Sequence, residues 1–215
     1  MDEKILIINP NSDPNMTKDI QKSADGFSQG DFEVECLSTL GAPKFIETYQ
    51  DQKDAAPGMI SLVKQYREKW DAFIVACHCD PNLDLIKGIT NKPVVGIGEA
   101  SMKIASILGT SFSVIQTSQY SVSMKEQLVQ KYHLQSSLAS VRAPEDEMKD
   151  WSKEKKYLET ARAAVKTDGA DAIVLGCAGM TGLDDLIQKE LGVWVLDGVV
   201  CALILAAGLV KSKQS

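Results

Sequence analysis

Short apolar runs alternate along the chain with segments whose apolar residues recur at helical spacing. Near-continuous apolar runs are typical of strands buried on both faces of a parallel sheet. They predict strands at 4–8, 32–37, 71–76, 93–97, 111–115 and 138–142, and again after 171. Helices are predicted between them, at 13–23, 58–69, 80–89, 98–108, 122–132, 158–165 and 199–209. Alternating strands and helices favour an α/β fold with mostly parallel sheets flanked by helices.

Turn-forming residues and helix caps predict where these elements begin and end. Two Asp-Pro pairs, at 13–14 and 80–81, each suggest an N-cap followed by a proline in the first helical turn. The run at 32–37 alternates apolar and acidic residues, which is typical of an edge strand with one wet face. The segment 40–57, rich in Gly, Pro, Thr and Gln, is predicted to be a long irregular loop, and 211–215 a frayed tail.

The chain contains an internal repeat, because 71–98 aligns without a gap on 171–198. The identical pairs include Asp71/Asp171, Cys77/Cys177, Leu83/Leu183, Asp84/Asp184, Val95/Val195 and Gly98/Gly198. The repeat predicts two related lobes that are pseudo-symmetric.

Each copy of the repeat carries a cysteine where an apolar strand ends, at Cys77 and Cys177. In parallel sheets, ligands bind beyond the carboxyl ends of the strands. A following helix N-terminus would favour the thiolate, bringing the thiol pKa from about 8.5 toward neutrality. Two thiols facing each other across one cleft between the lobes could remove and deliver a proton on opposite faces of a carbon. The alternative is that both cysteines are small core hydrophobes.

Composition and charge exclude several function classes. A net charge of −6 gives no electrostatic footprint for nucleic acid or an anionic membrane. No window reaches the roughly 20 apolar residues of a spanning helix, and the N-terminus does not resemble a signal peptide. Five cysteines, an odd number, argue against a disulfide framework and favour a cytoplasmic location where thiols stay reduced.

Other chemical motifs are absent or incomplete. Cys77-His78-Cys79-Asp80 contains zinc-ligating residue types, but neighbouring residues point to opposite sides and no second cluster completes a tetrahedron, so no metal is expected. The stretch 96–98 lacks the third glycine and the downstream acid of a dinucleotide fingerprint. A phosphate loop and a serine nucleophile elbow are both absent.

Several motifs together resemble the hydantoin and allantoin racemase branch of the aspartate/glutamate racemase superfamily. They are Ile8-Asn9-Pro10-Asn11-Ser12, Ala76-Cys77 with Asp80-Pro81, Val95-Gly96-Ile97-Gly98-Glu99-Ala100 and Gly176-Cys177-Ala178-Gly179-Met180. The resemblance covers nearly the whole chain. It implies two α/β lobes with the active site between them. The first lobe is expected to span 1–97 plus 198–215, with the C-terminal helix returning to it, and the second to span 98–197. The resemblance also implies a catalytic cysteine pair, no cofactor, and a homo-oligomer acting on a small-molecule substrate.

The resemblance also implies a set of site residues. Cys77 and Cys177 match the catalytic cysteines, and the residues matched to substrate binding are Asn9, Asn11, Thr117 and Ser118. Backbone N–H groups would hold the developing enolate oxygen around His78, Cys79, Ala178 and Gly179. Cys79 is a departure, because the family more often has a small residue there.

The same comparison indicates the type of substrate. The amino-acid racemases of the superfamily place an acidic residue at the end of the first strand, whereas this chain has neutral Asn9. They also carry Cys-Thr-His where this chain has 177–179. A neutral, amide-rich ring such as a substituted hydantoin or allantoin therefore fits better than a free amino acid. The alternatives are an aspartate/glutamate-type racemase, a maleate isomerase-like or arylmalonate decarboxylase-like enzyme, and a non-catalytic small-molecule binding protein.

Overall fold

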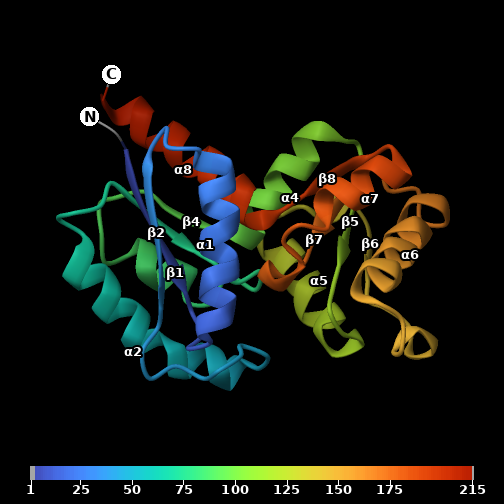
Figure 1. The fold of residues 1–215 in the computed structure, drawn as a ribbon, viewed down its shortest axis with the longest axis horizontal. Coiled ribbons are helices and arrows are strands. Elements are labelled where there is room, and N and C mark those ends of the chain that lie inside the picture. Colours follow the sequence, from blue (N-terminus) through green and yellow to red (C-terminus); the bar gives the residue numbers. More distant parts are fainter. Residues whose placement is uncertain (1–2, 215) are drawn as a thin grey trace. The chain divides into compact units, whose positions relative to one another are not determined.

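The computed structural model describes residues 3–214, which form two compact units (Figure 1). The first unit comprises residues up to Ala100 together with Val199 onward, and the second comprises Ser101–Gly198. Whether each unit folds as an independent domain, with the boundaries expected from the sequence, stays a prediction.

The first unit is built on a four-stranded parallel sheet with the order β2-β1-β3-β4. Its strands are β1 (Lys4–Asn9), β2 (Glu33–Ser38), β3 (Ala72–Val75) and β4 (Val94–Gly96). Its helices are α1 (Pro14–Ser28), α2 (Tyr49–Tyr66), α3 (Leu83–Lys87) and α8 (Gly198–Gln214), and α4 (Ile97–Leu108) begins in this unit. The strand predicted to be an edge strand, β2, lies at the edge.

The second unit repeats this topology, with a parallel sheet in the order β6-β5-β7-β8. Its strands are β5 (Phe112–Ile115), β6 (Leu138–Arg142), β7 (Ala172–Leu175) and β8 (Trp194–Leu196). Its helices are α5 (Val122–Lys131), α6 (Lys153–Lys166) and α7 (Asp184–Leu191), with short 3-10 turns that include Ala178–Met180. The repeat seen in 71–98 and 171–198 is therefore part of a duplication of the whole topology.

Apolar side chains from the strands and the covering helices form a separate core in each unit. In the first, Leu6, Trp70 and Phe73 pack with Met59 and Val63 of α2, and all five are fully buried. Burying a large apolar side chain contributes about 1.5–3 kcal/mol to the stability of the fold. The apolar runs in the sequence therefore predicted the strands and helices well. The predicted α/β class with parallel sheets is confirmed.

The two repeated aspartates that precede β3 and β7 have the same structural role. Asp71 Oδ2 accepts the backbone N–H of Lys4 at 3.1 Å, at the start of β1. Asp171 accepts the N–H groups of Thr110 and Ser111, each at 3.0 Å, just before β5. Each carboxylate thus links the amino ends of the two central strands of its sheet. This shared role explains why both copies carry an aspartate at this position.

The predicted irregular loop at 40–57 is confirmed for 40–48 but wrong from Tyr49 onward, because α2 begins there and continues through Pro57. A capping box starts the helix: Thr48 Oγ1 accepts the N–H of Asp51, and the Asp51 carboxylate accepts the N–H of Thr48. Pro57 is tolerated because it lies on the exposed face, where water can hydrate the carbonyl of Lys53 that loses its helical partner.

The C-terminal helix is also longer than predicted. We expected a frayed tail from Lys211, but α8 continues to Gln214, and Ser215 lies outside the described residues. Within residues 3–214, the helices are all too short or too polar to cross a lipid bilayer.

Candidate active site

Cys77 lies two positions beyond β3, at the carboxyl end of the first sheet. The chain turns there, with the N–H of Asp80 donating to the carbonyl of Cys77 at 2.8 Å. This turn brings the sulfur of Cys79 to 3.4 Å from that of Cys77, and both thiols are partly exposed. His78 between them is buried. Among the described residues, no group of three or more His, Cys, Asp or Glu side chains could hold a metal ion.

Asp80 does not cap the helix that follows it, contrary to the prediction from the Asp80-Pro81 pair. Its φ is 47°, and α3 begins only at Leu83. The Asp80 carboxylate instead accepts the N–H groups of Gly98 at 3.0 Å and Glu99 at 2.6 Å. It therefore caps α4, whose first N–H groups need an acceptor and whose dipole favours a negative charge. Cys77 consequently precedes a tight turn rather than the N-terminus of an α-helix.

The two glycines of the 95–98 motif make room for this carboxylate. A Cβ at Gly96 would overlap the carboxylate of Asp80. A Cβ at Gly98 would lie 2.7 Å from the carbonyl oxygen of His78 and 2.8 Å from Asp80 Oδ2. These glycines hold the turn that carries Cys77 close to α4, and that is their role in this unit.

Asn9 and Asn11 form a buried amide cluster beside the Cys77 turn. Asn9 ends β1, the strand next to β3, and its Nδ2 donates to Asn11 Oδ1 at 2.8 Å and to Thr17 Oγ1 at 3.0 Å. The N–H of Ala76 donates to the carbonyl of Ile8 at 2.9 Å, so Asn9 and Cys77 leave adjacent strands at the same edge. The structure thus brings the predicted residues of the first unit together.

Cys177 occupies the matching position beyond β7 in the second unit. It is the N-cap of the 3-10 turn Ala178–Met180, and its sulfur accepts the N–H of Gly179 at 3.4 Å. That N–H can stabilise negative charge on the sulfur. The helix expected directly after this cysteine is only a 3-10 turn, since α7 begins at Asp184. Ala178, the first residue of this turn, is buried, and Gly179 supplies the N–H group.

The sequence interpretation missed Gln116 as a site residue. The N–H of Gly176 donates to the carbonyl of Ile115 at 2.8 Å, which is the same bond that Ala76 makes to Ile8 in the first unit. Gln116 therefore occupies the position of Asn9, and both amides are buried. Aligning the strand ends of the two halves would have identified it. The predicted Thr117 and Ser118 follow it and are exposed.

Tyr157 is a second residue that the sequence interpretation missed. It lies on α6, is buried, and belongs to the apolar cluster against which Cys177 packs. Burial, and then the negative charge of Cys177, raise the pKa of Tyr157. The phenol therefore stays neutral beside the Cys177 turn. A single tyrosine within a charged helix gave no sequence signal that it would lie in the cluster next to Cys177.

The remaining cysteines differ from Cys77 and Cys177. Cys36 lies within β2, and burial raises its pKa to about 12. Cys201 lies on α8 with 3% of its surface exposed. The prediction that Cys36 is an inert strand cysteine agrees with this environment, because a reactive cysteine must be an accessible thiolate.

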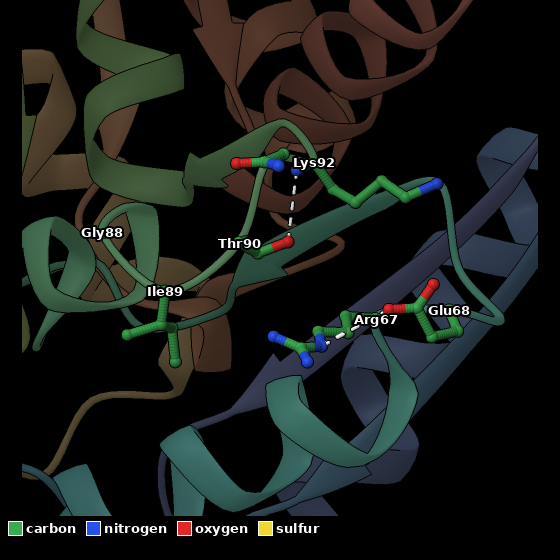
Figure 2. Close-up of a pocket in the computed structure, with 7 residues that line it drawn as sticks. Arg67, Glu68, Gly88, Ile89, Thr90 and Lys92 are labelled. Carbon is green, nitrogen blue, oxygen red and sulfur yellow. Dashed lines mark hydrogen bonds and ion pairs between the residues drawn. The ribbon is translucent and has the colours of Figure 1, made fainter.

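A cavity of about 340 Å³ lies at the amino ends of strands β3 and β4 in the first unit (Figure 2). It is lined by the end of α2 and by the loop before β4: Arg67, Glu68, Gly88, Ile89, Thr90, Asn91 and Lys92. Arg67 pairs with Glu68 at 3.5 Å, and the N–H of Lys92 donates to Thr90 Oγ1. This loop leads into β4, so the cavity is at the amino ends of the strands, away from Cys77.

Comparisons with known proteins agree with the predicted class. A profile described as Asp/Glu/Hydantoin racemase matches residues 5–206. Hydantoin racemase from Pseudomonas sp. (strain NS671) is 37% identical over 213 residues, covering 96% of this chain and 86% of that protein. The structure of allantoin racemase from Klebsiella pneumoniae matches with a TM-score of 0.91 and 31% identity, covering 98% of this chain and 89% of that one.

A more distant structure shares the fold alone. It is an aspartate racemase homologue from Pyrococcus horikoshii OT3, with a TM-score of 0.70, 16% identity, and coverage of 97% of this chain and 99% of that one. The matching profile, the hydantoin racemase and the allantoin racemase confirm the prediction of a racemase, and with it the isomerase class. The chain belongs to the Asp/Glu/hydantoin racemase family.

Proposed function

We propose that this chain is a cofactor-independent racemase in which Cys77 and Cys177 act as the two acid/base groups on a hydantoin-type or allantoin-type ring. One observation carries the proposal. Each unit holds a partly exposed cysteine just beyond the third strand of its sheet order, next to a buried amide at the end of the neighbouring strand. The amides are Asn9 in the first unit and Gln116 in the second.

The reaction is a transfer of one proton at a carbon that lies between a carbonyl and an amide nitrogen. One cysteine, as thiolate, removes the proton and leaves an enolate whose charge is delocalised onto the carbonyl oxygen. The other cysteine, as thiol, delivers a proton to the opposite face and becomes the thiolate. The mechanism requires both sulfurs to reach the same ring carbon from opposite sides, and a positioned acid/base group contributes about 10²–10⁴-fold.

Hydrogen-bond donors around the cysteines support this chemistry. The N–H of Gly179 donates to the sulfur of Cys177, and the thiol of Cys79 lies within reach of the sulfur of Cys77. In both units the stabilising group thus comes from the residue two positions after the cysteine. The proposed enolate ligands are the N–H groups near 78–79 and 178–179.

The substrate class is inferred from the uncharged amide side chains near the cysteines and from the named relatives. Asn9 and Gln116 are uncharged and buried, so they suit an amide-rich ring better than a substrate ammonium, which needs a carboxylate. The nearby carboxylate of Asp80 is already engaged by two N–H groups of α4. The relatives are a hydantoin racemase and an allantoin racemase.

The substrate is tested by following the decay of optical rotation of single enantiomers without added cofactor or metal. The panel contains alkyl-substituted hydantoins, allantoin, and free aspartate and glutamate, each with an enzyme-free blank. We expect decay well above the blank for at least one ring substrate and none for the free amino acids. Racemisation of the amino acids alone would refute the substrate class, and activity only after a metal or cofactor is added would refute the mechanism.

We also infer a homo-oligomer and a cytoplasmic location. The first is supported by apolar residues of α8 that remain exposed, Ile204 and Leu209. The second is supported by the odd number of cysteines, five, which argues against a disulfide framework. Sedimentation velocity would test the oligomer, because a monomer at micromolar concentration contradicts it.

A further inference from the structure

We infer that Cys77 and Cys79 form a reversible dithiol–disulfide modification site that a hydroperoxide can close. The effect on catalysis rests on the proposed function, because only a catalytic Cys77 makes the disulfide inhibitory. The disulfide itself follows from geometry that does not depend on the reaction.

The two sulfurs are already close to bonding distance. They lie 3.4 Å apart, and a disulfide is about 2.05 Å long, so the side chains need only a small rotation to close the gap. The turn from Cys77 to Asp80 curls the backbone between them, with the N–H of Asp80 on the carbonyl of Cys77. The Asp80 carboxylate fixes the far end of this turn on α4 through Gly98 and Glu99.

The partial exposure of Cys77 and Cys79 distinguishes them from the two other cysteines of the same unit. Cys77 and Cys79 are partly exposed, while Cys36 and Cys201 are buried. Burial raises the pKa of Cys36 to about 12, so it offers no thiolate at neutral pH. Peroxide attack requires an accessible thiolate, and the neighbouring thiol then acts as the resolving group.

The chemistry proceeds in two balanced steps. The Cys77 thiolate attacks one oxygen of the hydroperoxide, giving a sulfenic acid and releasing hydroxide or alkoxide. The sulfur of Cys79 then attacks the sulfenic sulfur of Cys77 and forms the S–S bond. The hydroxyl group of the sulfenic acid leaves, and the proton from the Cys79 thiol completes a molecule of water. Two thiols are oxidised by two electrons and the peroxide is reduced by two. An added dithiol reverses the bond by thiol–disulfide exchange.

Tryptic digestion separates this pair from every other cysteine. Peptide 70–87 contains both Cys77 and Cys79, while Cys36, Cys177 and Cys201 fall on peptides 23–44, 167–189 and 190–211. The protein is treated with hydrogen peroxide and the free thiols are alkylated. The masses of the tryptic peptides are then measured by mass spectrometry, with and without dithiothreitol treatment. Racemisation is measured on the same samples, each relative to its own untreated protein.

Two variants sharpen the test. Cys36→Ala removes a cysteine outside the pair and should behave like the wild type: peptide 70–87 loses two hydrogen atoms, activity falls in proportion, and dithiothreitol restores both. Cys79→Ser lacks the resolving thiol, so excess peroxide should oxidise the Cys77 sulfenic acid further to the sulfinic acid. The peptide should then keep two added oxygen atoms after dithiothreitol, which reduces a sulfenic acid but not a sulfinic acid.

The outcomes separate the modification from the function. If wild-type peptide 70–87 only gains oxygen, or remains a free dithiol at a peroxide dose that oxidises Cys79→Ser, the inference is wrong. If the disulfide forms while racemisation stays at its untreated rate, the modification site stands and the assignment of Cys77 as a base is refuted.

Discussion

The carboxylate of Asp80 accepts the backbone N–H of Gly98 at 3.0 Å, although eighteen positions separate the two residues in the chain. This bond joins the turn that carries Cys77 to the first turn of α4. The second copy has no equivalent, because Met180 stands in place of Asp80 and is fully buried in the apolar core. The two cysteines are therefore supported by different means in the two units.

Replacing Asp80 should destabilise the fold. In Asp80→Ala the N–H groups of Gly98 and Glu99 lose their acceptor, and an orphaned buried donor costs about 1–3 kcal/mol. We expect a loss in that range in the free energy of unfolding from urea denaturation. Asp19→Ala, which removes an exposed carboxylate on α1, is the matched control and should change it by less than about 0.5 kcal/mol. Equal effects of the two variants would contradict the capping role.

Gly96→Ala and Asp80→Ala should be strongly non-additive. The three atoms nearest to the new methyl group would all belong to the Asp80 side chain, so Gly96→Ala is expected to destabilise the wild type by about 1–3 kcal/mol. In the Asp80→Ala background that clash is gone, and Gly96→Ala should cost little. Gly98→Ala is the comparison, because its methyl group also meets the His78 carbonyl and should stay costly in both backgrounds. Additive effects at Gly96 would refute this packing.

A pH-dependent contribution is expected from Asp168. Its carboxylate accepts hydrogen bonds from Arg142 and Ser140, and the Arg142 guanidinium holds the pKa of Asp168 below its usual range. A carboxyl with a depressed folded-state pKa stabilises the fold above its unfolded pKa and loses that contribution as pH falls through the folded pKa. Asp168→Asn should therefore cost about 1 kcal/mol at neutral pH.

The difference between wild type and Asp168→Asn should shrink as the pH falls below about 4. Urea denaturation at several pH values measures it, with Asp185→Asn, at an exposed site on α7, as the control. A gap that persists unchanged into acid would show that charge on Asp168 is not its cause.

The cysteines should differ widely in reactivity in the native protein. With its pKa raised to about 12 by burial, Cys36 should remain unmodified by iodoacetamide at mildly alkaline pH, while Cys77, Cys79 and Cys177 are alkylated. Mass spectrometry of tryptic peptides measures the order, and denatured protein gives the fully labelled reference. Labelling of Cys36 as fast as that of Cys77 would contradict the buried environment.

The sequence was sufficient to predict the strands and one of the two helix starts that the Asp-Pro pairs suggested. Asp13 does cap α1, because its carboxylate accepts the N–H of Asn15, two positions away. Asp80 precedes a proline in the same way, yet its carboxylate caps a different helix. That choice depends on where β4 returns in space, which no local pattern contains. The start of α2, by contrast, was predictable from its capping box at Thr48 and Asp51.

The site was predictable to the extent that the repeat shows it. Two cysteines at equal positions after apolar runs were visible in the sequence, and the structure places each at the carboxyl end of its own sheet. Gln116 was overlooked because the first halves of the two units share no obvious identity, although their strands pair in the same way. Tyr157 belongs to the apolar cluster against which Cys177 packs, and it comes from a helix whose rotation the sequence alone did not fix.

The central claim is that Cys77 and Cys177 serve opposite faces of the substrate carbon, and single-cysteine variants in deuterium oxide test it most directly. Cys77→Ala and Cys177→Ala should each lose racemisation by about 10²-fold or more, with Cys36→Ala as the active control. Each variant keeps one base, so each should exchange the ring proton for deuterium in one enantiomer only, and the two variants should exchange opposite enantiomers. Normal racemisation by both variants, or exchange of the same enantiomer by both, would contradict the two-base assignment.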